Sequence, residues 1–474
     1  MSNYFLRDLV LAKSIQSSSS LRASEEIQSR GAEFKLLVLL VLAVLFGGGG
    51  AAYGLYNLVV QIAALIVLAL SPRNLTSFIA TAPRAFVALV FAVFLLPLLQ
   101  VIPLPEQVWS MLPGRILLQE SLELIGKGAS WYPLSLAPTR TLIAFFSLIP
   151  VLAVVTLAWS LNEEAWIRVS GLLFLLSLLL FVFGSVQLVS GNNLFIIYTH
   201  ERIRPTFLYS VFANHNTAGV FFLLALMALL VIVGRESRSS NRSRSARRSW
   251  QLPWVMGLGF ALLALAVILT QSRSSIIILI MIVAAGAISL VKACSLAPQA
   301  KAGIVLAGIA LAIGGGAVLQ NETRLSTSFD RFEELDNIRP AIWEDTVSSA
   351  KRFWPVGSGI SSFPEVFEVD ETLEHVWRYH AARAHNDYLE VAQEAGFVGV
   401  FLLAGGVVWL FVTSYRAYRG GYRRYGIAAA GAVGIVALQS FVDYPLRNQA
   451  ILCLSAYFIS LLVFAARSKE PIEC

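Results

Sequence analysis

The chain has 474 residues, of which 57% are hydrophobic and only 14% are charged. A soluble globular protein has about a quarter charged residues, so this composition excludes that class and indicates that most of the chain lies in lipid. The formal net charge is +7, and arginines crowd into short loops between apolar runs. That pattern favours a topology signal with anionic-lipid contact over nucleic-acid binding.

Residues 1–35 are a polar leader, too long for a cleavable signal peptide, and we interpret them as a cytoplasmic N-terminal tail. Residues 36–466 form the membrane domain, and residues 467–474 are a second cytoplasmic tail. The domain contains about twelve apolar runs, each nearly long enough to cross the hydrocarbon layer as a helix. These runs are 36–54, 55–70, 85–103, 141–159, 169–189, 217–233, 252–270, 276–291, 303–319, 396–414, 426–442 and 450–465. The predicted fold is an all-α, polytopic membrane protein.

Basic residues gather in three connections between these runs. They are Arg235, Arg238, Arg242, Arg244, Arg247 and Arg248 in the first, Lys292 and Lys301 in the second, and Arg416, Arg419, Arg423 and Arg424 in the third. Counting runs places all three connections on the same side as both termini. Because positively charged short loops face the cytoplasm, both termini are expected there.

This topology puts the longest connection, residues 320–395, outside the cytoplasm between the ninth and tenth runs, and we expect it to be mostly helical. All five histidines of the chain fall in extracytoplasmic segments: His200, His215, His375, His380 and His385. Because histidine exchanges protons near neutral pH, their placement points to chemistry on the outer face.

The densest group of polar residues is AHNDYLEVAQEAGFVGV at 384–400, directly before the tenth apolar run. A helix is expected over residues 386–395. Asp387 either orients a nearby histidine or caps this helix, whereas Tyr388 is expected to pack in the core.

The second outer loop carries groups suited to an anion. Arg202 and Arg204 precede Pro205, and FANHN at 212–216 stands where the next helix starts. Arginines beside a helix N-terminus can bind an anion, although Asn214 or Asn216 can equally be an ordinary helix cap.

Two further outer segments are less informative. Arg273 lies among serines in a very short loop, where it either binds an anion or extends to headgroup phosphates. The first outer loop, 104–140, contains Trp109 and Trp131, which are typical of the membrane interface. Its Arg115 and Arg140 suggest no function.

Within the large loop, Pro340 is placed at an expected helix start, with Arg339 at the boundary. The turn PVGSGISSF at 355–363 has glycines that allow close backbone approach, which is weak evidence for phosphate binding. The last three histidines are five residues apart, on different faces of a helix, and the chain has no CxxC or HExxH motif. We therefore expect no metal site.

Five of these segments together resemble the O-antigen ligase and polymerase superfamily of bacterial membrane glycosyltransferases. They are FANHN at 212–216, SRSS at 272–275, IRPAIW at 338–343, VGSGISSF at 356–363 and AHNDYLEVAQEAGFVGV at 384–400. The resemblance extends from about residue 85 to the last apolar run. PLLQVIPLP at 97–105 and PLSLAP at 133–138 also look like members near exopolysaccharide clusters.

The resemblance implies a metal-independent, inverting transferase without a cofactor, in the bacterial inner membrane with its active site on the periplasmic face. It implies an undecaprenyl-diphosphate-linked glycan as donor, a glycan or lipid-linked molecule as acceptor, and contact with membrane lipids but not with nucleic acid. Lipopolysaccharide and exopolysaccharide biosynthesis are the implied pathways.

The resemblance also assigns residues. The family's His-Asn pair maps to His385 and Asn386, its Ser-Arg arginine to Arg273, and its arginine before a tryptophan to Arg339. Its arginine before the N-x-N motif maps to Arg204. Arg202 is the alternative, because Pro-Thr-Phe stands where family members often have a glycine.

The chemistry of these side chains agrees with the assignment. Arginine forks bind phosphate oxygens bidentately and stabilise a departing diphosphate without a metal. A neutral histidine can take the proton that an acceptor hydroxyl loses as it attacks the anomeric carbon. The candidate catalytic residues are His385 and Arg273, the candidate diphosphate-binding residues Arg204, Arg202 and Arg339, and the supporting residues Asn214, His215, Asn216 and Asn386.

Two alternatives remain open at this point. A ligase moves a finished glycan onto an acceptor, whereas a polymerase joins repeat units, and the first outer loop favours polymerisation slightly. A transporter or anion-binding membrane protein is the alternative outside the transferases. The apolar runs hold no Asp, Glu, Lys, Arg or His away from their ends, which counts against transport.

Overall fold

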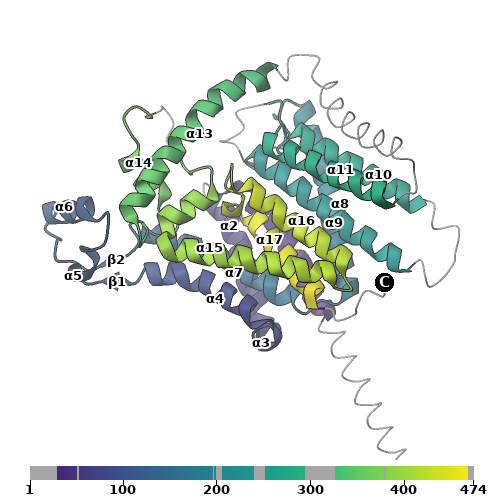
Figure 1. Cartoon of the computed structure of the whole chain (residues 1–474), viewed down its shortest axis with the longest axis horizontal. Helices are drawn as coiled ribbons and strands as arrows, with labels where there is room; N and C mark the ends of the chain where they lie inside the picture. Colours follow the sequence, from purple (N-terminus) through teal and green to yellow (C-terminus); the bar gives the residue numbers. More distant parts are fainter. Residues whose placement is uncertain are drawn as a thin grey trace, which may run out of the picture.

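The computed structural model describes residues 29–50, 53–195, 197–198, 205–239, 251–293, 326–376 and 381–467. Over these residues the chain is a bundle of α-helices with one short antiparallel strand pair (Figure 1). This confirms the helical class expected from the sequence. Of the expected apolar runs, 303–319 lies outside the described residues, as do most of the N-terminal tail and nearly all of the C-terminal one.

The described elements follow one another along the chain. The first part contains η1 (Gly47–Gly49), α2 (Gly54–Ala69), α3 (Pro72–Thr81), α4 (Arg84–Gln100), β1 (Pro103–Leu104), α5 (Glu106–Trp109), α6 (Ile116–Leu124), β2 (Tyr132–Pro133), α7 (Pro138–Ala158), α8 (Glu163–Val189) and α9 (His215–Ser239). The second part contains α10 (Gln251–Leu269), α11 (Arg273–Ala293), α13 (Ser326–Phe353), α14 (Phe363–Asp370), α15 (Asp387–Arg419), α16 (Arg423–Gln439), η3 (Pro445–Arg447) and α17 (Gln449–Arg467).

Six described helices are long and apolar enough to cross a membrane, or up to seven if α2 and α3, bent by 80°, form one span. The six are Ser29–Gly49, α7, α8, the His215–Val233 part of α9, α15 and α17. Shorter apolar helices occur in α4, α10 and α11. Within the described residues every expected run lies on a helix, but the expected number of about twelve spans is not confirmed.

Two helices form the centre of the bundle. The apolar windows of α9 and α17 are each 78% buried, whereas only 17% of the window of α15 is buried. α9 packs against α8, α10 and α16, and α17 packs against α7, α15 and α16. α15 therefore keeps an exposed apolar face, which lipid can cover.

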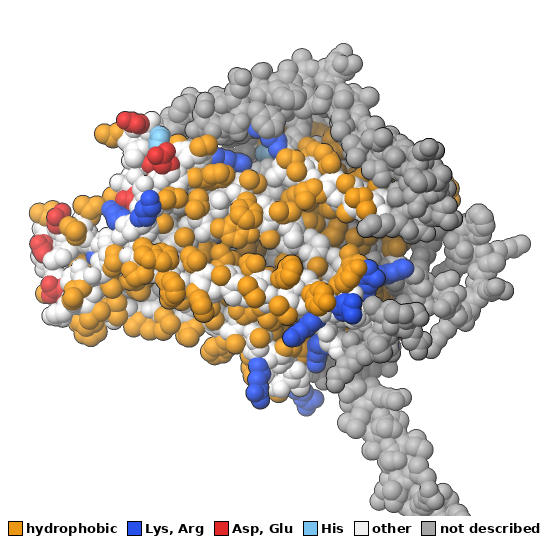
Figure 2. Space-filling model, viewed as in Figure 1, with side chains coloured by type: hydrophobic (Ala, Val, Ile, Leu, Met, Phe, Trp, Pro, Cys, Tyr) orange, Lys and Arg blue, Asp and Glu red, His pale blue; other side chains and the backbone are white. Residues whose placement is uncertain are grey.

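One end of the bundle is basic, and we call it the basic end. Arg467 at the end of α17 lies over the Trp159 ring at the end of α7, and Tyr425 of α16 donates to Glu163 of α8, 2.9 Å apart. Exposed arginines flank this end: Arg73, Arg84, Arg416, Arg419, Arg423 and Arg424. Figure 2 shows a cluster of lysine and arginine at this end, acidic residues with some basic ones toward the opposite end, and a broad apolar surface between them.

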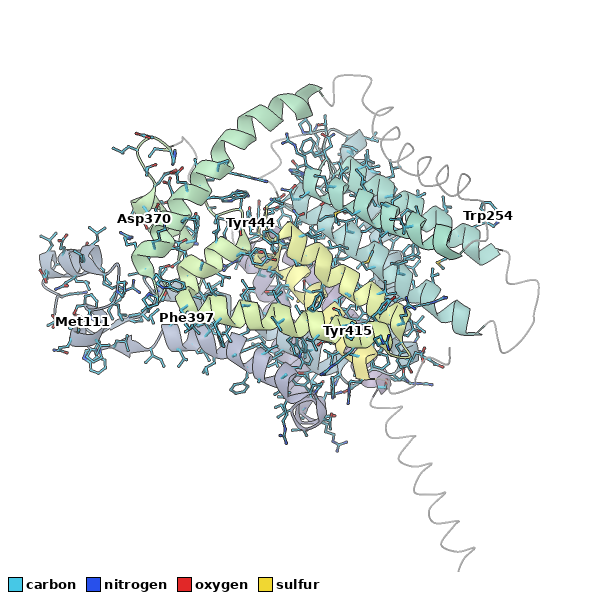
Figure 3. All side chains as sticks on the ribbon, in the orientation of Figure 1. Met111, Trp254, Asp370, Phe397, Tyr415 and Tyr444 are labelled. Carbon is cyan, nitrogen blue, oxygen red and sulfur yellow. The ribbon has the colours of Figure 1, made fainter. Side chains whose placement is uncertain are left out.

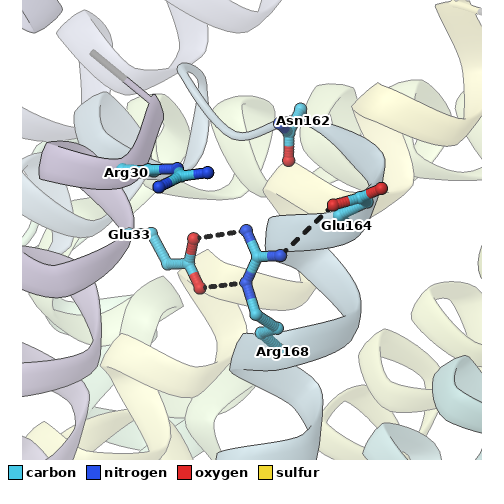
Figure 4. A pocket seen from close by; sticks show the side chains of 5 residues that line it. All are labelled: Arg30, Glu33, Asn162, Glu164 and Arg168. Carbon is cyan, nitrogen blue, oxygen red and sulfur yellow. Dashed lines mark hydrogen bonds and ion pairs between the residues drawn. The ribbon is translucent and has the colours of Figure 1, made fainter. Parts of the chain in front are cut away.

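An ion-pair clasp ties the first helix to α8 at the basic end (Figure 4). Arg168 places Nε 2.6 Å and Nη2 2.8 Å from the two carboxylate oxygens of Glu33, and its Nη1 lies 3.4 Å from Glu164. With Arg30 and Asn162 these side chains line a small polar pocket. Because both carboxylate oxygens of Glu33 are bound by the guanidinium, the ion pair fixes the relative orientation of the two side chains as well as pairing their charges.

The opposite end holds the long connections, and we call it the loop end. Its described parts are 101–137, 205–214, 270–272, 354–376, 381–386 and 440–448. The first outer loop has its own small core there: Trp109 is fully buried, its Nε1 donates to the Ser130 carbonyl at 2.9 Å, and its ring contacts Tyr132. The interfacial role expected of Trp109 is therefore wrong, because intramolecular packing covers the ring. Trp131 is exposed.

Arg115, to which the sequence assigned no role, joins this loop to the turn at 355–363. Only 1% of Arg115 is exposed, and its guanidinium donates to the carbonyls of Pro113, Leu134 and Gly357. Burial lowers the pKa of Arg115 to about 10. The arginine thus acts as a structural bridge between backbone segments far apart in the sequence.

A break in α15 organises the loop end. Gly396 has φ of 55°, which divides a short helix over 387–395 from the membrane-spanning part. This confirms the helix expected at 386–395. The turn at 355–363 packs into the break: Ser358 and Gly359 donate their amides to the carbonyls of Gln393 and Glu394 at 3.0 and 2.8 Å, and Phe397 donates to Pro355 at 2.8 Å.

Side chains close the same junction. Gln100, at the end of α4, donates to the Glu394 carbonyl at 3.1 Å and accepts from the Ile360 amide at 2.8 Å. The glycines of the turn are needed for this close approach, since a Cβ on Gly357 would lie 2.6 Å from the Glu394 carbonyl oxygen. The Gly-Ser-Gly turn is thus engaged by backbone and not open to a phosphate.

A separate lobe, α13 with α14, covers the loop end. Asp345 of α13 is 1% exposed and accepts from the Thr372 amide at 3.3 Å and from His375 Nδ1 at 2.9 Å. Arg352 of α13 pairs with Asp370 at 3.0 Å. These contacts hold the segment after α14 against α13.

We predict that Gly396→Ala destabilises the protein, because the new Cβ would overlap the Pro355 carbonyl and a left-handed non-glycine residue costs about 1–2 kcal/mol by itself. Thermal unfolding in detergent should show a lower Tm. Gly405→Ala is the matched control, since nothing lies within 4 Å of its Cβ on the same helix. Equal Tm values for the two variants would contradict the role of the break.

We predict that the contact of His375 with Asp345 weakens as pH rises. The hydrogen bond with Asp345 raises the pKa of His375 above its ordinary value of 6.5. The pair therefore contributes fully below pH 6.5 and loses its contribution as pH rises through the higher folded value. Hydrogen exchange of residues 371–376, corrected for intrinsic rates, should accelerate across that window. His375→Gln should remove the pH dependence; a variant that retains it would refute the assignment.

Candidate functional site

His385 lies in the turn that precedes α15, with φ of 49°. Asn386 is the N-cap of the helix, and its side-chain oxygen accepts from the amides of Tyr388 and Leu389 at 3.0 and 3.1 Å. The helix cap is thus Asn386 and not Asp387. The Asp387 carboxylate does not contact a described histidine either, because it is directed toward Ser440 and Arg447. Tyr388 donates to the Ala437 carbonyl at 2.8 Å and packs on Phe441, as expected of a packing residue.

The carboxylate beside His385 is Asp443, in the connection between α16 and α17. Asp443 Oδ1 lies 3.4 Å from His385 Nδ1, an ion-pair distance longer than a usual hydrogen bond. Tyr444 contacts the imidazole edge to face, with ring centroids 5.1 Å apart; its label in Figure 3 marks this place in the bundle. His385 remains accessible, since 31% of its side chain is exposed, whereas Asp443 is buried.

The electrostatics of Asp443 favour its charged form. Burial alone would raise the pKa of Asp443, but the interaction with His385 and the positive charge of Arg339 together lower it below the ordinary value. The carboxylate is therefore available to hold the imidazole in one orientation and to stabilise an imidazolium.

Arg339 comes to this group from α13. In the same helix Trp343 donates Nε1 to the Ala384 carbonyl at 3.0 Å, which brings IRPAIW beside the residue that precedes His385. The helix start expected at Pro340 is wrong, because Pro340 lies inside α13, which begins at Ser326. Two of the segments that carry the family resemblance, IRPAIW and the one that begins at Ala384, are nevertheless in contact.

A second group forms where α9 and α11 begin. α9 starts at His215 and α11 at Arg273, and His215 Nδ1 lies 3.0 Å from the Thr270 carbonyl. The helices touch closely, since a Cβ on Gly219 would lie 2.8 Å from Ser275 Cβ. Two helix N-termini, with Arg273 at one of them, therefore stand side by side at the loop end.

Asn214 caps α9, which was one of the two alternatives that the sequence left open. Its side-chain oxygen accepts a hydrogen bond from the Asn216 amide at 2.8 Å. Arg202 and Arg204 lie outside the described residues, as do His200 and His380. The positions of both arginines relative to these groups stay a sequence-based prediction.

The glycine-rich η1 turn connects the two groups. The Gly48 carbonyl accepts from the Ala213 amide at 3.1 Å, next to the start of α9. On its other side a Cβ on Gly47 would lie 2.9 Å from the amide nitrogen of Ala450, at the start of α17. The starts of α9 and α17 thus contact opposite sides of the η1 turn. Asp443 lies in the connection that leads into α17.

Sequence reasoning missed Asp443. The signal was present in DYPLRN at 443–448, a polar run with both charges in a very short connection between two apolar runs. Asp443 becomes a candidate site residue only in the folded chain, where its carboxylate lies beside His385. Within the described residues no group of three or more His, Cys, Asp or Glu is arranged to hold a metal ion.

One family comparison bears on this geometry. The family model described as O-antigen ligase matches residues 258–404, a range that includes Arg273, Arg339 and His385. None of the curated proteins compared with the chain matches it. The matched residues carry the helices α10, α11, α13 and α14 and the break of α15, with the histidine that faces Asp443. Over this range, about a third of its length, the chain is similar to the O-antigen ligase family.

Proposed function

We propose that the protein is an inverting, metal-independent glycosyltransferase that takes a glycan from an undecaprenyl-diphosphate donor at the loop end. The observation that carries the proposal is the His385–Asp443 pair beside Arg339, inside and next to the matched ligase domain. A histidine that is accessible and backed by a buried carboxylate is the arrangement of a general base.

The loop end is proposed to face the periplasm. Exposed arginines concentrate at the basic end, and basic flanks of membrane spans remain in the cytoplasm. The opposite end, with His385, Asp443 and the starts of α9 and α11, then lies on the outer side of the inner membrane. A lipid-linked glycan presented there reaches these groups without crossing the bilayer.

In the proposed reaction His385 removes the proton from an acceptor hydroxyl through Nε2, while Nδ1 faces Asp443. The acceptor oxygen forms a bond to the anomeric carbon as the bond from that carbon to the phosphate oxygen breaks. The electron pair leaves with the undecaprenyl diphosphate. A single displacement of this kind inverts the anomeric centre, and Asp443 stabilises the imidazolium that forms.

The diphosphate is proposed to lie at the paired starts of α9 and α11. Backbone amides at a helix N-terminus and the positive end of the helix dipole attract phosphate, and two such termini meet here. Arg273 stands at one of them, where a guanidinium would hold phosphate oxygens as negative charge develops. Arg339 is the second arginine at the site, and Arg204 or Arg202 is the third proposed from the family resemblance.

We predict that His385→Gln and Asp443→Asn lower glycan transfer from a lipid-diphosphate donor in proteoliposomes, by about 10²–10⁴-fold for the base. Arg273→Gln should cost about 10²–10³-fold by loss of leaving-group stabilisation. The matched control is His375→Gln, which removes the other described histidine paired with an aspartate and should leave transfer unchanged. Full transfer by folded His385→Gln would show that the base is elsewhere.

We predict that donor alone gives a ladder of longer glycans on the carrier lipid, which is the outcome for a polymerase. A ligase would give no ladder until a lipid acceptor is added. Gel analysis of extracted lipid-linked glycans separates the two. The same reaction with EDTA should proceed at an unchanged rate; a loss reversed by a divalent cation would contradict metal independence.

A further inference from the structure

A buried ionic network lies directly beside the His385–Asp443 pair and has no part in the proposed reaction. Arg447 of η3, 16% exposed at its side chain, lies 3.6 Å from Asp387, 3.3 Å from Glu390 and 2.9 Å from Glu394. These acids are spaced so that they share one face of the short helix over 387–395. Arg383 binds Glu390 from the other side at 2.7 Å.

The network is costly unless every member stays paired. Glu390 and Glu394 are fully buried, and taking charges out of water is offset only by close, well-directed partners. Burial alone disfavours the charged guanidinium, yet Glu390, Glu394 and Asp387 together raise the pKa of Arg447 above its ordinary value. Arg447 therefore stays charged and is held to one position by three carboxylates.

The same two chain segments carry both the network and the catalytic pair. Asp443 precedes Arg447 by four residues, and His385 precedes Asp387 by two. Between them the Asp387 amide donates to the Ser440 carbonyl at 2.9 Å, and the Ser440 hydroxyl donates to the Asp387 carboxylate at 2.9 Å. The network thus joins the segments immediately on either side of the His385–Asp443 contact.

His385 also needs such support from its surroundings. Its φ of 49° is in the left-handed region, which is strained for a non-glycine residue and persists only when neighbouring contacts determine it. The Nδ1–Oδ1 separation of 3.4 Å leaves the pair without a short hydrogen bond that would fix it directly.

We propose that Arg447 is a positioning residue: through Asp387, Glu390 and Glu394 it sets the distance between Asp443 and His385. The inference rests on the proposed function for its catalytic consequence, but the geometry it describes is independent of the reaction. Asp443 and Tyr444 face the imidazole from the connection before α17, and Arg339 acts on Asp443 from α13.

The test uses the full-length protein in detergent and two variants. Arg447→Lys keeps the charge but loses the fork that spans the carboxylates, and Ser440→Ala removes one neutral hydrogen bond. The first measurement is the rate of His385 modification by diethylpyrocarbonate at one fixed pH, followed by mass spectrometry. Because the contacts with Asp443 and Tyr444 restrict access to the imidazole, modification should be faster in both variants, more so in Arg447→Lys.

The second measurement is transfer kinetics. Both variants should lower kcat while KM changes less than twofold, and Arg447→Lys should lose about 10–100-fold, as expected when a catalytic group moves by about 1 Å. The matched control is Arg168→Lys, which disrupts an equivalent arginine fork at the basic end and should change neither readout. If Arg447→Lys fails to fold, Ser440→Ala decides the question.

Unchanged modification rates in both folded variants, or a fall in kcat without a changed modification rate, would overturn the inference. If the rates change but His385→Gln retains full transfer, the positioning of His385 by Arg447 stands and the proposed base is wrong. The two failures are therefore distinguishable.

Discussion

The arrangement of the loop end depends on which groups form hydrogen bonds with the backbone amides and carbonyls at the break in α15. Where a helix breaks near a membrane, freed amides and carbonyls need partners because lipid offers none. Here the turn after α13 and Gln100 of α4 supply them, contacting the carbonyls of Gln393 and Glu394. Three distant parts of the chain are joined at this one point, and the break gives the short helix a direction different from that of the span it precedes.

That direction has an electrostatic consequence. The short helix presents Asp387, Glu390 and Glu394 to Arg447 and places His385 at its start, beside Asp443. The partly exposed imidazole thus lies beside groups whose positions are fixed by buried ion pairs. Such a site needs little reorganisation when charge develops, which is the condition under which fixed dipoles and charges stabilise a transition state.

Much of this organisation could be predicted from the sequence, and the reasons for the exceptions are physical. Apolar runs predicted helices because lipid permits few other structures, and the break at Gly396 fell where the polar helix met the apolar run. Pro340 was misplaced because a proline within a helix is tolerated when its surroundings compensate, so its presence does not fix a start. Asp443 was missed because its importance lies in a contact with His385, 58 residues away in the chain, and such contacts have no local pattern.

The range matched by the family model does not form an independent unit in this fold. The matched range, 258–404, contains His385 but neither Asp443 nor Arg447, and it excludes α9 and α17, the most deeply buried of the described spans. A chimera exchanging only this range between relatives would import His385 without Asp443, and the acidic face of the short helix without Arg447. A functional exchange should therefore keep residues 443–447 together with the start of α15, because the ion pairs of Asp443 and Arg447 join these two segments.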